Sequence, residues 1–245
     1  MRLIARLDIK GEKLIKGVQF EGLRVIGDPH EHALKYADQA DELLYIDTVA
    51  TLYGRNHLEK LIEKVTEEIF IPITVGGGIS TIHAARSIFR FGGDKIAINS
   101  AGIKNPDFIN KISEQWGKQS LCVSIEAKRT PHGWEAYTDN GRERTHKDAV
   151  KWAFEAVERG AGELLITSID QDGTMKGFDI ELIRAIAPNV SVPVIAAGGM
   201  GSIEHLQRVI REGKADAVAM ASCLHYGRVT LQQARDSIQL MPRSS

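Results

Sequence analysis

The strongest constraint on this chain is a regular alternation of short apolar runs with longer amphipathic segments. Eight such runs occur in 245 residues, so one unit averages about 31 residues (245 divided by eight), the size of a strand followed by a helix. Hydrophobicity within each run is continuous, as in strands buried on both faces of a parallel sheet. The runs cover residues 2–8, 43–47, 71–75, 94–98, 121–126, 163–168, 193–197 and 216–220.

The segments between the runs have the spacing of amphipathic helices. In residues 56–69 the apolar side chains recur at steps of three and four, namely at Leu58, Leu61, Ile62, Val65 and Ile69. Eight units without a long Pro/Gly/Ser linker favour a closed barrel over an open doubly wound sheet. We therefore predict the α/β class and a single (β/α)8 TIM barrel that forms one domain over residues 1–245.

The chain also repeats itself at half its length. Pro72–Gly78 (PITVGGG) resembles Pro193–Gly199 (PVIAAGG) at an offset of 121 residues (193 − 72). Glu42-Leu43-Leu44 matches Glu163-Leu164-Leu165 at the same offset. This repeat predicts two half-barrels, at about 1–118 and 119–245.

Composition narrows the class of protein. Thirty-one Lys+Arg against 32 Asp+Glu give a net charge of -1, which does not favour a nucleic-acid partner. Cys122 and Cys223 suit neither a disulfide framework nor a zinc site, so we expect a reducing, cytoplasmic location and no metal. The charged N-terminus and the absence of a long apolar run predict no signal peptide and no membrane partner.

Polar residues after the strands indicate two phosphate sites at the C-terminal face of the barrel, where this fold places its chemistry. Glycine exposes backbone N–H groups to a phosphate, and the following helix start adds a favourable dipole. The alternative is a pair of tight turns. Two such sites on opposite sides predict an elongated substrate with a phosphate at each end. The first cradle comprises Gly76, Gly77, Gly78, Asn99 and Ser100, and the second comprises Gly198, Gly199, Ala221 and Ser222.

Midway between the cradles, the half-barrel repeat places the carboxylates of Asp8 and Glu126. Two acids in different environments can act as general acid and general base on one substrate held between them. The alternative is that they form salt bridges to Lys10 and Lys128. The ligand spacing around Asp170 and Asp172 does not suit a calcium-binding loop, and a lone histidine such as His225 is more often structural. Further polar residues at this face are Asp47, Asp170, Asp172 with Gly173, and His225.

The opposite face of the barrel carries charges where apolar packing is usual. Arg2, Glu42, Lys95 and Glu163 stand at the N-terminal starts of their strands, with Asp94 beside Lys95. They form either a solvated rim or an ionic ring across the barrel bottom.

Several motifs together resemble the family of cyclase subunits of imidazole glycerol phosphate synthase, of histidine biosynthesis. The resemblance covers nearly the whole chain. It rests on Leu7–Lys10, Lys16–Val18, Gly27–Pro29, Thr74–Ile79, Asp94–Ser100 and Thr167–Thr174.

The resemblance implies a lyase that combines ammonia with a bis-phosphorylated ribulosyl aminoimidazole carboxamide nucleotide. The products are imidazole glycerol phosphate and aminoimidazole carboxamide ribotide, and no cofactor is expected. A glutaminase subunit would dock at the N-terminal face as a heterodimer and supply ammonia through the barrel. The ring of Arg2, Glu42, Lys95 and Glu163 would then be the ammonia gate and Asp94 part of the partner interface, while Lys16 and Thr167 would join the substrate-binding residues.

The chain departs from the family pattern at several positions. Glu126 stands where the family has Asp, Arg6 where it often has Cys, Asn140 where a small residue is common, and His146 where Gly is usual. With Leu52-Tyr53-Gly54-Arg55, these departures also fit a paralogue that delivers ammonia for amidation of a surface-polysaccharide sugar, as in lipopolysaccharide biosynthesis. A phosphosugar isomerase is a further alternative, although it would not need the ionic ring.

Overall fold

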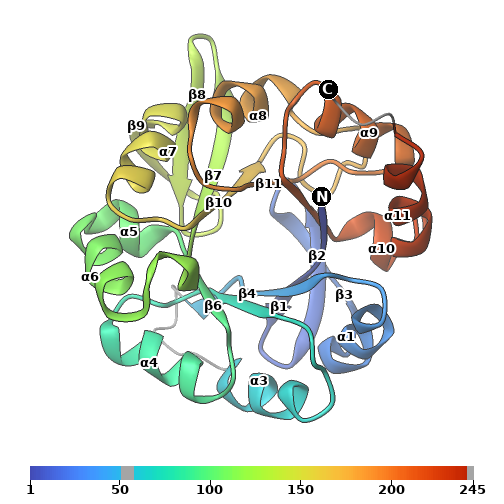
Figure 1. Cartoon of the computed structure of the whole chain (residues 1–245), viewed down its shortest axis with the longest axis horizontal. Helices are drawn as coiled ribbons and strands as arrows, with labels where there is room; N and C mark the ends of the chain where they lie inside the picture. The colour runs from blue at the N-terminus through green and yellow to red at the C-terminus, as the bar shows by residue number, and fades with distance from the viewer. Residues whose placement is uncertain (51–57, 242–245) are drawn as a thin grey trace.

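The computed structural model describes residues 1–50 and 58–241. Its centre is a closed barrel of eight parallel strands within the described residues, which confirms the predicted fold class (Figure 1). Each strand begins within two residues of a predicted apolar run. The barrel strands are β1 (Arg2–Lys10), β4 (Glu42–Asp47), β5 (Ile73–Gly76), β6 (Lys95–Ile98), β7 (Leu121–Thr130), β10 (Glu163–Ser168), β11 (Val194–Ala197) and β12 (Ala217–Met220).

Hydrogen bonding between β1 and β12 closes the ring. Arg2 pairs with Ala217 on one side of β1, and Ile4 pairs with Glu42 on the other side. β7 pairs with β6 and with β10, so the second half continues the same ring. Every barrel strand therefore has two parallel neighbours, and the barrel itself has no free edge.

Helices surround the barrel and cover the outer face of its strands (Figure 1). They are α1 (Pro29–Ala37), α3 (Leu58–Thr66), α4 (Ile82–Arg90), α5 (Ser100–Lys104), α6 (Asp107–Trp116), α7 (Ala149–Glu158), α8 (Ile180–Ile186), α9 (Ile203–Arg211), α10 (Ser222–His225) and α11 (Leu231–Gln239), with 3-10 turns at Lys118–Ser120 and Ala187–Asn189.

Local sequence explains where these helices begin and how they pack. In α3 the predicted apolar positions Leu58, Ile62 and Val65 are buried. The hydroxyls of Thr81 and Ser202 accept backbone N–H bonds and so cap α4 and α9, which occupy the same place in the two halves. The half-barrel organisation, with its boundary near residue 118, stays a prediction.

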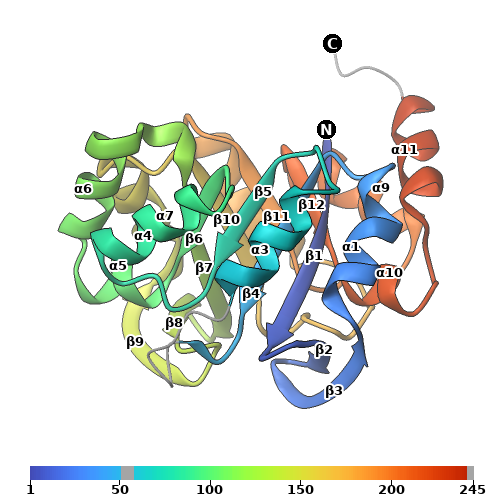
Figure 2. The same cartoon turned by 90° about the horizontal axis from the view of Figure 1, so that it is seen from below.

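Two antiparallel ribbons extend the first strand of each half, and the apolar runs did not predict them. β1 continues into β2 (Lys13–Val18) and β3 (Glu21–Gly27), whereas β7 continues into β8 (Gly133–Thr138) and β9 (Glu143–Asp148). Figure 2 shows both ribbons at the same end of the barrel, the end toward which β1 runs. They flank the face where the C-terminal ends of the strands lie.

Alternation along each strand divides the core into two layers. On β1, Leu3, Ala5 and Leu7 belong to the large cluster between the strands and the helices, whereas Ile4 belongs to a small cluster inside the barrel. That inner cluster contains many small side chains, and it separates the charged bottom of the barrel from the mouth. Its members are Ile4, Leu44, Ala97, Cys122, Leu165, Ile195, Ala197, Ala217 and Ala219.

Candidate functional site at the barrel mouth

The two predicted acids lie on opposite sides of the barrel. Asp8 is part of β1 and pairs with Ile46 of β4, whereas Glu126 is part of β7 and pairs with Thr167 of β10 and Tyr137 of β8. Going round the ring of described strands in either direction, three strands separate β1 from β7. Both acids are buried and lie before the last residue of their strand, because the ribbons prolong β1 and β7.

Asp8 is held by two buried cations. Arg6 Nε donates to Asp8 Oδ1 at 2.7 Å, and Lys16 Nζ donates to Asp8 Oδ2 at 2.7 Å. Burial acts to raise the pKa of Asp8, but the charges of Arg6 and Lys16 outweigh it and keep that pKa well below its ordinary value. Asp8 is therefore ionised at neutral pH. Its partners are Arg6 and Lys16 instead of the Lys10 considered as the structural alternative.

Glu126 lies in a different environment. Its Oε2 accepts the backbone N–H of Gly141 at 2.7 Å, while Lys128, the partner considered in the sequence, places its Nζ over the ring of Tyr137. Burial raises the pKa of Glu126 to about 7, because the opposing effects of Gly141, Arg6 and Asn99 are smaller. One acid thus stays ionised while the other exchanges its proton near neutral pH, which is the separation that acid and base roles require.

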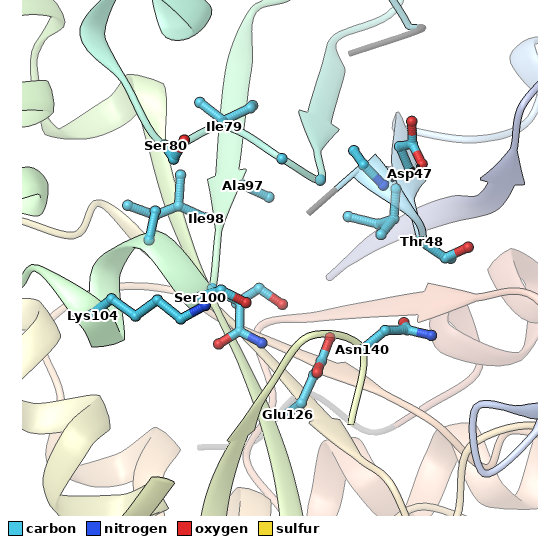
Figure 3. A pocket seen from close by; sticks show the side chains of 17 residues that line it. Asp47, Thr48, Ile79, Ser80, Ala97, Ile98, Ser100, Lys104, Glu126 and Asn140 are labelled. Atoms are coloured by element: carbon cyan, nitrogen blue, oxygen red, sulfur yellow. Dashed lines mark hydrogen bonds between the residues drawn. The ribbon is translucent and has the colours of Figure 1, made fainter. Parts of the chain in front are cut away.

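The first predicted cradle opens into a cavity of about 260 Å³ at the mouth. Gly77 has a φ of 101°, and a Cβ there would overlap the carbonyl oxygen of Asp47, so glycine is required. Asn99 donates to the carbonyl of Tyr137. The structure brings together Asp47, Gly77, Gly78, Asn99, Ser100, Glu126 and Asn140 around this cavity (Figure 3).

Two polar side chains around this cavity also hold neighbouring loops. The Ser100 hydroxyl donates to Asp139 Oδ1 at 3.2 Å and accepts the Asp139 backbone N–H at 3.0 Å. Asp47 Oδ1 accepts the N–H groups of Val49 and Ala50, and so fixes the start of the loop after β4. Residues 52–55, which the sequence singled out in that loop, lie outside the described residues.

The second cradle is much tighter. Gly198 has a φ of 84°, and the cavity beside it has a volume of about 20 Å³. The Ser222 hydroxyl oxygen is buried and has no hydrogen-bond partner among the described residues. This cavity is lined by Arg6, Lys16, Asp172, Gly173, Gly198, Gly199, Ala221 and Ser222.

Lys16 and Arg6 connect Asp8 to this second cradle. Lys16 Nζ also donates to Asp172 Oδ2 at 2.9 Å, and Arg6 Nη1 donates to Thr167 Oγ1 at 3.1 Å. The two cations therefore cover Asp8, which lines neither the first nor the second cavity. The sequence predicted one reactive centre between two facing acids, but in the structure Glu126 lines the first cavity and Asp8 lies behind the cations of the second.

At the opposite end, the four charged residues at the strand starts form a closed ring. Arg2 bonds to Glu42 at 2.9 Å and also to Glu163, while Lys95 bonds to Glu42 at 2.8 Å and to Glu163 at 2.7 Å. Burial acts to lower the pKa of Lys95, but the two glutamates outweigh it and raise that pKa. The ring is thus an ionic layer across the barrel. Asp94 lies beside it and accepts the backbone N–H of Ile73.

The other polar residues predicted at this face form hydrogen bonds within the fold. The backbone N–H of Arg129 donates to Asp170, and His225 Nδ1 pairs with the Tyr36 hydroxyl at 2.9 Å. Burial lowers the pKa of His225 to about 4. His146 lies on the outer ribbon near Glu135 and is not a lining residue of either cradle.

The described part of the chain contains no group of three or more His, Cys, Asp or Glu residues arranged to hold a metal ion. Among its helices, none has both the length and the apolar character of a membrane span. The ion pairs through Arg6 and Lys16 were the main feature of the site that motif analysis missed. The even side-chain alternation along β1, which turns residues 2, 4, 6 and 8 inward, was the available signal.

Comparisons with known proteins show which family the chain resembles. The model of a family described as "Histidine biosynthesis protein" matches residues 2–230. Imidazole glycerol phosphate synthase subunit HisF of Legionella pneumophila is 57% identical over 83% of this chain and 97% of its own length. The same-named subunit of Thermosynechococcus vestitus is 46% identical over 96% of this chain and 86% of its own. These relatives support neither the polysaccharide-amidation nor the isomerase alternative.

Proposed function

Since this chain belongs to the histidine biosynthesis protein family as a cyclase subunit of imidazole glycerol phosphate synthase, we propose that its mouth is where ammonia closes the imidazole ring. The substrate is the bis-phosphorylated ribulosyl aminoimidazole carboxamide nucleotide. The reaction is a lyase reaction that yields imidazole glycerol phosphate and aminoimidazole carboxamide ribotide. The observation that carries the site assignment is the pair of opposed buried acids: Glu126 lines one glycine-lined cavity, and Asp8 is bonded to the two cations that line the other.

The substrate spans the two cradles. One phosphate binds the backbone at Gly77 and Gly78 beside Asn99 and Ser100, and the other binds at Gly198 and Gly199. At the second cradle the unpartnered Ser222 hydroxyl supports this assignment, because a buried donor without a partner favours an anionic acceptor. The reacting carbons of the substrate then lie over Glu126 in the larger cavity.

The two acids divide the chemistry. Adding ammonia to a carbonyl carbon and losing water requires a group that takes a proton from nitrogen and returns one to oxygen. Glu126, with its pKa near 7, serves as that acid and base. Asp8 remains ionised and stabilises the positive charge that develops on the nitrogen as the ring closes.

Ammonia reaches this centre from the barrel bottom. A glutaminase partner docks at the N-terminal face to form a heterodimer, with Asp94 in the interface, and the ring of Arg2, Glu42, Lys95 and Glu163 is the gate. Beyond the ring lies the apolar inner cluster, and its member Ala97 also lines the Glu126 cavity. The small side chains of that cluster offer neutral ammonia a path that a charged ammonium ion would enter only at high desolvation cost.

The location follows from the activity and composition. Biosynthetic chemistry, two buried free cysteines and the balanced charge favour the cytoplasm, with no nucleic-acid or membrane partner.

A steady-state assay with an ammonium salt and the bis-phosphate substrate tests the proposal. Wild-type protein turns the substrate over, whereas Glu126→Gln lowers kcat by about 100-fold or more because it removes the titrating group. Glu135→Gln is the matched control, because Glu135 is a buried glutamate on the outer ribbon, paired with Arg144. Absence of wild-type turnover, or equal loss in both variants, contradicts the assignment.

A further inference from the structure

Arg6 is a buried cation that belongs both to an acid of the site and to a cradle. It points into the barrel from β1, between the apolar inner cluster and Asp8, and its side chain is 5% exposed. Its Nε bonds to Asp8 and its Nη1 bonds to Thr167, while its side chain lines the cavity beside Gly198. A change in that cavity therefore acts on Asp8 through one side chain.

The second cradle is too small for a phosphate in the conformation described. Its volume of about 20 Å³ accommodates roughly one water molecule. A phosphate group carries four oxygens around one phosphorus, so a lining group has to retreat before the phosphate enters. The cavity shares Lys16 and Gly173 with an open groove of about 750 Å³, which is also lined by Arg24 and Arg228. That groove gives an anion a positively charged approach.

Of the two cations that line this cavity, Arg6 is the one more easily recruited by the phosphate. Lys16 is held by two carboxylates, those of Asp8 and Asp172. Arg6 is held by one carboxylate and one neutral hydroxyl, and its Nη2 has no hydrogen-bond partner among the described residues. A guanidinium also binds phosphate through two parallel N–H bonds, which an ammonium group cannot do.

We propose that Arg6 is a positioning residue that clasps Asp8 while the second cradle is empty and turns to the substrate phosphate when the cradle fills. Phosphate binding then releases Asp8 Oδ1, while Lys16 keeps Oδ2. Asp8 becomes available to the substrate only when a phosphate occupies the second cradle.

The charges around this pair favour such an exchange. Asp8 faces Arg6 on its own strand and Lys16 on β2, while Asp172 lies beyond Lys16, Glu126 lies on β7 and His225 lies on α10. When the guanidinium of Arg6 moves away from Asp8, it gives up that ion pair, and the entering phosphate becomes its new negatively charged partner. The exchange therefore leaves no buried charge unpaired.

NMR of the arginine Nε–H groups tests this clasp, the bond from Arg6 Nε to Asp8, in the complete protein at neutral pH. Inorganic phosphate is the probe, and calorimetry measures its binding. This inference rests on the proposed phosphate role of the second cradle, yet its readout does not require turnover. Arg6→Lys assigns the Arg6 signal. Arg144 is an internal control, since its Nε lies 3.2 Å from Glu135 on the outer ribbon.

Phosphate is expected to shift the Arg6 Nε–H signal and to speed the exchange of that proton with solvent. The phosphate concentration at the midpoint of this shift should match the dissociation constant measured by calorimetry, and the Arg144 signal should stay in place. Arg6→Met should weaken phosphate binding by about tenfold, the effect of one charge-assisted hydrogen bond. Binding without a change at Arg6 overturns the clasp, as does absence of binding or unchanged affinity in Arg6→Met. An inactive wild type that shows the Arg6 response contradicts only the cyclase assignment.

Discussion

Replacing Glu126 by Gln should stabilise the protein although it lowers kcat. The Glu126 carboxyl is buried without a cation paired to it, so ionising it in the folded state is costly. Gln keeps the shape of the side chain and an oxygen that can accept the Gly141 N–H, but it never ionises. The cost of the charge is therefore removed and the hydrogen bond is retained.

The magnitude and its sign follow from linkage. Raising the pKa from 4.5 to about 7 corresponds to about 3 kcal/mol, at roughly 1.4 kcal/mol per tenfold change in proton affinity. Between these pH values the unfolded chain has released its proton and the folded chain keeps it, so this contribution to stability falls as pH rises. Above pH 7 the wild type bears the full free-energy cost of the ionised, buried Glu126 carboxylate, whereas below pH 4.5 it bears none of that cost.

Thermal unfolding of wild type and Glu126→Gln at pH 5 and pH 8 measures this effect. At pH 8 the variant should gain about 3 kcal/mol, or about 6–12 °C in Tm for a chain of this size, and at pH 5 the gain should fall to about 1 kcal/mol. Glu135→Gln should instead destabilise the protein at neutral pH. The bond from Arg144 lowers the pKa of Glu135, so the ionised carboxylate stabilises the fold when the pH is above the ordinary pKa of a glutamate, and this contribution is lost in acid. An equal Tm change for Glu126→Gln at both pH values would refute the reasoning.

Three further outcomes are expected. Asp8→Asn leaves Arg6 and Lys16 buried without their carboxylate, and thermal unfolding should show a loss of about 3–5 kcal/mol; a neutral substitution would contradict the network. Arg2→Ala opens the ionic ring, so glutamine-dependent turnover with the partner should fall about tenfold, equivalent to about 1.4 kcal/mol, while turnover with ammonium salt persists. Equal losses of glutamine-dependent and ammonium-dependent turnover would argue against a gate. Ser222→Ala should raise KM for the bis-phosphate about tenfold with kcat retained, since it removes one hydrogen bond to a charged group; an unchanged KM would place the phosphate elsewhere.

The sequence predicted the barrel because its strands are buried on both faces, and continuous apolar runs identify such strands directly. It did not predict the ribbons, because β9 (ERTHKD) is polar and half of β3 is exposed. Their strand character comes from pairing with β8 and β2, which no local pattern encodes. The positions of the cradles followed from the glycine pairs and their repetition in both halves.

The ion pairs of the site depend on tertiary distance. Lys10, a close neighbour of Asp8 in the chain, is the salt-bridge partner that local sequence suggests, but Lys10 is exposed at the end of β1. The ribbon brings Lys16 back over Asp8 instead. Likewise, the Arg6 contact with Thr167 joins strands that are far apart in the sequence. Only the closed ring places these groups together.

Because the ribbons prolong β1 and β7, both acids are anchored within continuous strands. Glu126 pairs with β10 on one side and β8 on the other, whereas Asp8 pairs with β4 and the residues that follow it pair with β2. A group carried on a surface loop can be redirected by inserting or deleting residues, but a group in such a lattice has a fixed Cα. Evolution can then adjust its reach only by changing the side chain itself. A carboxylate one methylene longer at position 126 is the kind of variation that this architecture permits, and it retunes the centre without disturbing the scaffold.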